Sequence, residues 1–214
     1  MSIDLNILNE LQLVVNTHIH RFENFYERYF NRPDTRELVQ YFFNRIYTLE
    51  GKAERDKTAK KVYDRFRAVL SEKAKERIEN LMNLNDLTDS LDLQMAVALQ
   101  KNPQLQNHTT EGGVISPDVF RELYRIANSQ KDREEQLQLI LHNLESFFEL
   151  SKHPLAEMMM KPASMAAAMV GAKSIFAIFE EGYRATRPVQ KEIFTEFMQV
   201  VRQKENQFLQ SIYN

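Results

Sequence analysis

Residues 162–183, PASMAAAMVGAKSIFAIFEEGY, form the stretch that decides the predicted fold. Alanine and glycine remove side-chain bulk from most sides of its first half, which allows neighbouring backbones to approach closely. A helix that is apolar nearly all round is normally buried. We therefore expect a buried central helix rich in Ala, Gly and Met. In such a helix, Gly171→Leu should lower the free energy of unfolding by about 1 to 3 kcal/mol, because leucine would overpack a close helix crossing.

The same stretch is too short to cross a membrane. Its most apolar part, residues 165–179, is shorter than the roughly 20 residues that a spanning helix needs, and Lys173 interrupts it. The first residues show no basic segment followed by an apolar run, so we expect no secretory signal. The sequence contains no Cys, which suits a reducing compartment. These features predict a soluble, cytoplasmic protein without a membrane span.

Helical periodicity extends on both sides of this stretch. In residues 4–30, Leu8, Leu11, Val15 and Phe22 share one helix face, and residues 71–103 keep the same period. Proline and glycine mark most helix ends, and Pro162 should end a short Met-rich helix. Ser116, Pro117 and Asp118 should begin a helix, as its N-cap, its first-turn proline and an acid near its positive end. We predict an all-α, single-domain bundle covering residues 1–214, with about seven to eight helices and an irregular loop at about 102–116.

The charge pattern argues against nucleic acid as a partner. The 28 basic and 30 acidic side chains leave a net charge of −2, too small for a long-range attraction to a polyanion. The most basic segment, residues 52–67, is interleaved with acids, and its aromatic residues fall on the expected core face. Any partner must therefore be selected by local contacts.

No arrangement of residues predicts catalysis, a cofactor or a metal. His18 occupies a position where the helix period requires an apolar residue, so we expect a buried, hydrogen-bonded histidine rather than a haem or metal ligand. Asp86, Asp89 and Asp92 recur every three residues, which spreads them around the helix by about 60°. We interpret them as a solvated face. Phosphate-binding glycine loops and hydrolase nucleophile motifs are absent from the sequence.

Three polar residues after the predicted loop form one half of a candidate site. Arg133 and Gln136 are neighbours on one helix surface, and Arg125 ends the preceding short helix and can fold back toward them. An enclosed guanidinium requires a carboxylate, carbonyl oxygens or an anionic ligand. Two hypotheses follow, namely a structural clamp in which Arg133 pairs with a nearby acid, and a ligand-binding site.

The other half of the candidate site lies in the Met-rich region. Met165 and Met169 have flexible thioether side chains that can shape an apolar pocket or fill an ordinary core. Glu180 would stand at the mouth of such a pocket, or pair with Arg184 one turn away.

Several short motifs resemble, in their order and spacing, those of a bacterial family described as the FFLEE-motif proteins. They include Tyr41-Phe42-Phe43, Tyr124-Arg125 with Arg133 and Gln136, Lys161-Pro162-Ala163, Phe179-Glu180-Glu181-Gly182-Tyr183 and Lys204-Glu205. Asn44-Arg45 stand where that family usually has Leu-Glu. The resemblance implies a shared fold and lineage, and it implies no particular activity.

Two hypotheses of function follow from the sequence. The first is a non-catalytic helical module that binds a protein partner or a second copy of itself. The second is a binder or enzyme for an apolar, lipid-like or aromatic small molecule, held in a cavity lined by the Met/Ala-rich helix. A void beside Met165 and Met169 would favour the small molecule, and a filled core with an apolar surface patch would favour the interaction module.

Overall fold

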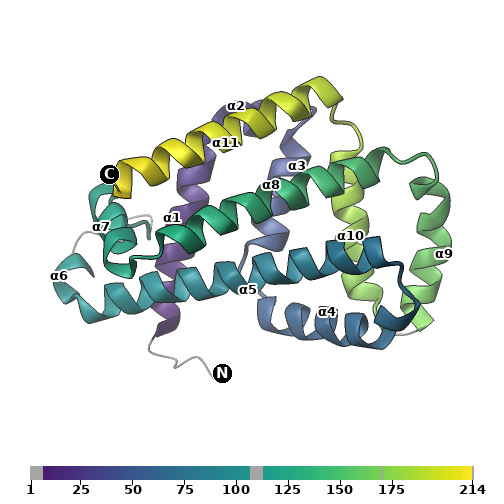
Figure 1. The fold of residues 1–214 in the computed structure, drawn as a ribbon, viewed down its shortest axis with the longest axis horizontal. Coiled ribbons are helices and arrows are strands. Elements are labelled where there is room, and N and C mark those ends of the chain that lie inside the picture. The colour runs from purple at the N-terminus through teal and green to yellow at the C-terminus, as the bar shows by residue number, and fades with distance from the viewer. Residues whose placement is uncertain (1–6, 107–112, 170, 214) are drawn as a thin grey trace. The chain divides into compact units, whose positions relative to one another are not determined.

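A computed structural model describes residues 7–106, 113–169 and 171–213, and its regular elements are helices (Figure 1). Eleven α-helices lie within these described residues. They are α1 (Leu8–Phe25), α2 (Glu27–Asn31), α3 (Arg36–Tyr41), α4 (Lys52–Phe66), α5 (Glu72–Lys101), α6 (Pro103–Gln106), α7 (Pro117–Ala127), α8 (Gln130–Lys152), α9 (Ala156–Met169), α10 (Lys173–Thr186) and α11 (Lys191–Tyr213). A π-helical turn, Phe42–Ile46, follows α3, and a 3-10 turn, Arg67–Val69, follows α4.

The all-α prediction is confirmed, and the predicted number of about seven to eight helices is too low. The prediction joined α2 to α1 as one helix, whereas the structure separates them at Tyr26. It also placed no helix in the loop at 102–116, where the four residues of α6 are helical. Helices of one turn carry too few apolar repeats to be recognised by periodicity. Residues 107–112 of that loop lie outside the described residues.

The chain forms two compact units. Unit 1 comprises Met1–Glu27, Met82–Ile140 and Phe197–Asn214, and unit 2 comprises Arg28–Leu81 and Leu141–Glu196. The helices α5, α8 and α11 each contribute residues to both units. A single domain over residues 1–214 stays a prediction.

Unit 1 has a core of aliphatic and aromatic side chains from α1, α5, α7, α8 and α11. Its most buried members include Val14, Leu91, Met95, Leu99 and Leu123. The start of α7 follows the sequence signals, with Pro117 in the first turn after Ser116 and Asp118 near the positive helix end. Asn128 ends α7 in a left-handed conformation, with φ of 46°.

Unit 2 contains a close approach between α3 and α10. Its core includes Leu38, Tyr41, Phe148, Tyr183 and Phe194. The rings of Phe148 and Phe194 stack with their centroids 3.9 Å apart. Gly182 of α10 lies against the Tyr41 ring, since a Cβ atom added to the glycine would lie 2.5 Å from Tyr41 Cζ. The lack of a side chain at this position therefore allows the two helices to meet.

The predicted buried central helix is wrong. The stretch at 162–183 is divided between α9 and α10, which lie side by side in Figure 1, and Gly171 between them has a left-handed φ of 77°. Met158, Met165 and Met169 of α9 expose 73%, 64% and 87% of their surface. Alanine counts as apolar in a pattern but has little side-chain area to bury, so an Ala-rich helix has a weak tendency toward the core. Three of the methionines of α9 consequently remain exposed.

Two further predictions in this region are corrected. Pro162 lies inside α9 and does not end a helix. Gly171 is not a close crossing, because nothing lies within 4 Å of an added Cβ. A substitution of Gly171 would act through backbone strain at positive φ rather than through overpacking.

In the part of the chain that the structure describes, no helix combines the length and the apolar character needed to span a membrane.

Candidate functional site

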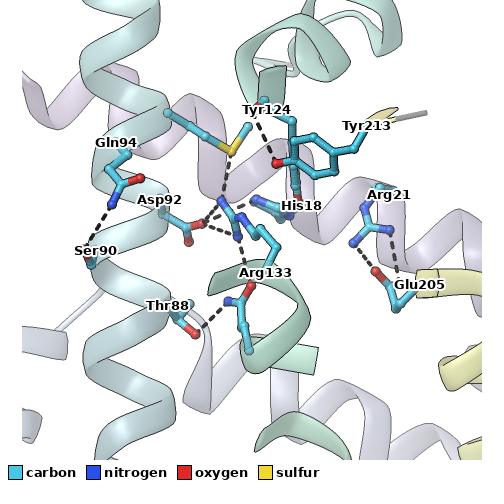
Figure 2. A network of polar contacts seen from close by, with 12 residues as sticks. His18, Arg21, Thr88, Ser90, Asp92, Gln94, Tyr124, Arg133, Glu205 and Tyr213 are labelled. Atoms are coloured by element: carbon cyan, nitrogen blue, oxygen red, sulfur yellow. Dashed lines mark hydrogen bonds and ion pairs between the residues drawn. The ribbon is translucent and has the colours of Figure 1, made fainter. Parts of the chain in front are cut away.

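Three side chains of unit 1 form a buried charged network, seen in Figure 2. Asp92 of α5 places Oδ1 at 3.4 Å from His18 Nε2 of α1 and at 3.4 Å from an Arg133 Nη of α8. His18, Asp92 and Arg133 are only 3%, 3% and 4% exposed. One carboxylate therefore contacts an imidazole and a guanidinium from two other helices.

Other contacts hold the Arg133 guanidinium in place. Arg133 donates to Gln136 Oε1 at 3.0 Å, and the Gln136 amide donates to Thr88 Oγ1 at 2.8 Å. The Tyr124 ring lies 4.7 Å from Arg133 Cζ, a distance at which a cation and an aromatic face attract each other. Met95 Sδ accepts from Arg133 at 3.0 Å. These contacts link α5, α7 and α8 (Figure 2).

The protonation of this network follows from burial. Burial lowers the pKa of His18 below its ordinary value of 6.5, and the positive charges of Arg133 and Arg21 lower it further. The Asp92 carboxylate raises the pKa but does not compensate for burial. His18 is therefore neutral at pH 7, and the Asp92 charge is balanced by Arg133.

A second, largely enclosed ion pair, with side chains 10% and 12% exposed, joins α1 to α11 within unit 1. Arg21 donates to both carboxylate oxygens of Glu205, at 3.1 and 2.8 Å, and Tyr26 Oη donates to the same carboxylate at 2.6 Å. The Arg21 guanidinium also lies 4.2 Å from the Phe208 ring centroid. This bidentate pair fixes the relative position of two helices that are far apart in the sequence.

The structure brings together two of the three polar candidates. Arg133 and Gln136 are hydrogen-bonded neighbours, as their spacing predicts. Arg125 instead donates to the Ile212 carbonyl at 3.0 Å and pairs with Glu122, and its side chain is 47% exposed. It thus secures the end of α11 and takes no part in the buried network.

The remaining candidates belong to unit 2. Met165 and Met169 lie on the exposed side of α9, and Glu180 of α10 pairs with Arg184 across one helical turn. A ligand-binding role for the six candidate residues stays a prediction.

The buried network is suited to stabilising the fold rather than to catalysis. A histidine beside an aspartate can act as a general base only if a substrate reaches the imidazole. His18 is enclosed by the Phe120, Tyr124 and Phe22 rings, with centroids at 4.8, 5.9 and 6.1 Å. Among the described residues, no group of three or more His, Asp or Glu side chains is arranged to hold a metal ion.

Two features of unit 1, the burial of Asp92 and the Arg21–Glu205 pair, differ from or are absent from the sequence predictions. Asp92 was assigned to a solvated face, yet it is buried, while Asp86 and Asp89 are exposed as expected. A usable signal existed, because Met95 and Leu99 follow Asp92 at three and seven residues and so share its helix face. The Arg21–Glu205 pair has no comparable signal, since the partners are 184 residues apart.

Two surface depressions lie in unit 2, and neither is lined by residues of α9. One, of about 270 Å³, is lined by Asn44, Arg45, Thr48, Glu50, Arg55 and Ile178. The other, of about 150 Å³, is lined by polar and charged residues of α5 and α8. Neither has Met165 or Met169 in its lining.

The fold and its buried network define an all-helical protein stabilised by enclosed ion pairs. The chain belongs to the family described as Domain of unknown function (DUF8198), which matches residues 3–214. No curated protein matches the chain. No solved structure matches it either. The FFLEE-motif resemblance and a bacterial origin stay predictions.

Stability should fall as the pH drops below about 6.5, and His18 should account for part of the fall. Because the pKa of His18 is lowered in the folded state, the unfolded chain takes up a proton first. The contribution is constant above pH 6.5 and is lost between 6.5 and the lower folded pKa, by at most about 1.4 kcal/mol per pH unit.

Urea unfolding at a series of pH values measures this slope. His18→Gln should have a flatter pH profile than the parent, and His20→Gln, which alters an exposed histidine of the same helix, should keep the parent's profile. Equal slopes for the parent and His18→Gln would show that His18 titrates normally in the folded protein.

Proposed function

We propose that this chain is a non-catalytic protein-interaction module and that α9 carries its binding surface. The observation behind the proposal is the exposure of three large apolar side chains on one helix. Met158, Met165 and Met169, together with Pro162, are hereafter called the methionine face. At 100° per residue, these four positions fall within an arc of about 60°.

An exposed apolar face of this kind favours a binding role. Contiguous exposed apolar patches are uncommon on monomeric proteins and mark binding surfaces. Methionine is suited to the task because its unbranched, polarizable side chain adapts to the shape of a partner. Leu155, just before α9, is a further exposed apolar side chain in this segment.

Pro162 gives a second, independent reason to propose a binding surface on α9. It lies in the interior of α9, where it cannot donate the hydrogen bond that the Met158 carbonyl would otherwise accept. Proline in a helix interior costs about 3 kcal/mol relative to alanine. The Pro162 side chain is exposed, so packing in the free protein does not compensate for this cost. Local rules are most often broken at functional sites, and a bound partner would supply the missing contacts.

The alternative function, binding of an apolar small molecule, has less support. It requires a cavity beside Met165 and Met169, but both side chains are exposed, and the two depressions in unit 2 described above are lined by residues of other elements. We further propose that the module acts in the cytoplasm, and the nearly balanced charge argues against nucleic acid as its partner.

Photo-cross-linking in living cells tests the proposal. A photoreactive amino acid at Met165 should give an adduct with one protein, identified by mass spectrometry as a second copy or another polypeptide. The same group at Leu81, an apolar residue of α5 that is 51% exposed, is the matched control and should give no such adduct. Identical adducts at both positions, or none at Met165, would count against an interaction role for α9. An apolar molecule retained in native mass spectrometry would favour the alternative.

A further inference from the structure

We propose that the partner of the methionine face is a second copy of the same chain, with the two α9 helices packed antiparallel. This inference rests on the proposed function and names the partner of the same surface. It follows from the spacing of the four residues, from the charges around them and from the area that they expose.

The spacing of the methionine face is the same in both directions. Successive members are separated by four, three and four residues, from Met158 through Pro162 and Met165 to Met169. An antiparallel copy centred between residues 163 and 164 therefore places Met158 opposite Met169, and Pro162 opposite Met165, on both sides of a two-fold axis. An interface between identical chains requires this self-complementarity. Alternating steps of four and three residues are also the spacing by which paired helices interdigitate.

Charges around the face favour the antiparallel arrangement. Lys161 is the one charged side chain between Met158 and Met169. In the antiparallel pair, the two copies of Lys161 are offset by five residues, about 7.5 Å along the helix axis. That offset is close to one Debye length at physiological ionic strength, about 8 Å, so the repulsion between the two ammonium groups is weakened. Glu157 pairs with Arg187 of its own chain at 2.6 Å, so Lys161 is the charge that decides the direction. Parallel pairing in register would bring the two copies of Lys161 side by side, and antiparallel pairing separates them.

The size of the surface predicts a reversible dimer. Three methionines that each expose well over half of their area leave only a narrow stripe to bury. Pairing two such stripes covers on the order of 1,000 Å², the lower limit for a specific interface. Association should therefore depend on concentration over the micromolar range instead of being permanent.

Sedimentation velocity of the full chain over a range of concentrations tests this proposal. The parent should show a monomer–dimer equilibrium. Met158→Glu and Met169→Lys should each weaken association at least tenfold, because each places one charge against an apolar side chain of the second copy. Both changes suit the helix dipole, with an acid near the start of α9 and a base near its end, so folding should be preserved. Leu81→Glu is the matched control and should associate like the parent.

The double variant Met158→Glu/Met169→Lys tests the register. In the proposed pairing, each new carboxylate faces a new ammonium group, so the double variant should recover the association that each single variant loses. An equimolar mixture of the two single variants should also associate. Parallel pairing predicts no recovery in the double variant, since like charges would then meet at both positions.

A cross-linking measurement keeps the proposal testable if a charged variant folds poorly. The chain has no native cysteine, so an introduced one is unique. A mixture of differently sized Met158→Cys and Met169→Cys proteins should form disulfides mainly between unlike chains. Four results would each overturn the proposal. They are a monomeric parent, single variants that associate like the parent, a double variant without recovery, and cross-links mainly between like chains. If the chain does not self-associate and the photoreactive group at Met165 cross-links to a different protein, the proposed interaction function is retained and only the proposed self-pairing is wrong.

Discussion

Arg133→Met is expected to lower the free energy of unfolding by about 3 to 5 kcal/mol, because it leaves the Asp92 carboxylate buried without its cation. Methionine keeps much of the apolar stem and removes the charge, so lost packing contributes little. The buried environment makes the effect large, since Asp92 is 3% exposed and cannot recover solvation by turning outward. Urea or thermal unfolding measures the loss.

Two comparisons distinguish the loss of a buried ion pair from a general sensitivity of unit 1 to substitution. Arg125→Met removes a guanidinium that is about half exposed, so it should cost no more than about 1 kcal/mol. Asp92→Asn combined with Arg133→Met removes both charges and should recover part of the loss, because no uncompensated ion then remains. A loss in the double variant equal to the sum of the two single losses would show that the side chains act independently.

The protonation of His18 gives a readout that a loss of packing would not change. Arg133 is one of the charges that lower the pKa of His18, and Asp92 raises it. Removing the guanidinium should therefore raise the pKa of His18, which NMR titration of the imidazole can follow. If Arg133→Met is as stable as the parent and loses a bound ligand that the parent retains, the structural interpretation of Arg133 is wrong and the site binds that ligand.

The sequence predicted helices well where several local signals agree. At the start of α7, Ser116, Pro117 and Asp118 indicate the same boundary, and the structure has it there. The long helix α5 was also recognised, because its apolar period continues over many turns. The stretch at 162–183 misled the prediction because Gly171, which separates two helices, was interpreted as a small residue inside one.

The buried network was predictable only in part. His18 interrupts an apolar face, so its burial could be expected, and the spacing of Arg133 and Gln136 made their contact foreseeable. The acid that pairs with Arg133 was not foreseeable, because the three aspartates were interpreted together as one solvated face. Asp92 is turned by about 60° around the helix from Asp86. This rotation carries Asp92 onto the buried face of α5.

Gly182→Ala is expected to destabilise unit 2 by about 1 to 3 kcal/mol, although alanine is the better helix former. Gly182 lies inside α10, where helix propensity alone would favour alanine by about 1 kcal/mol. The new Cβ, however, would lie 2.5 Å from Tyr41 Cζ, 2.6 Å from Cε1 and 2.7 Å from Oη. Tyr41 has little room to retreat, because it is buried against Phe42 and Phe147, with ring centroids at 5.5 and 6.4 Å. Overpacking should therefore exceed the gain in propensity.

A double-mutant cycle with Tyr41→Leu isolates this contact. Leucine is shorter than tyrosine and leaves space beside α10, so in that background Gly182→Ala should become neutral or stabilising, by up to about 1 kcal/mol. Gly171→Ala is the comparison for a glycine at positive φ with no neighbour within 4 Å. It should cost about 1 to 2 kcal/mol from backbone strain and show no coupling to Tyr41. Chemical unfolding of the four proteins of the cycle gives the coupling energy. The same loss from Gly182→Ala in both backgrounds would mean that Tyr41 does not limit the space at this crossing, and that α3 and α10 meet through other side chains.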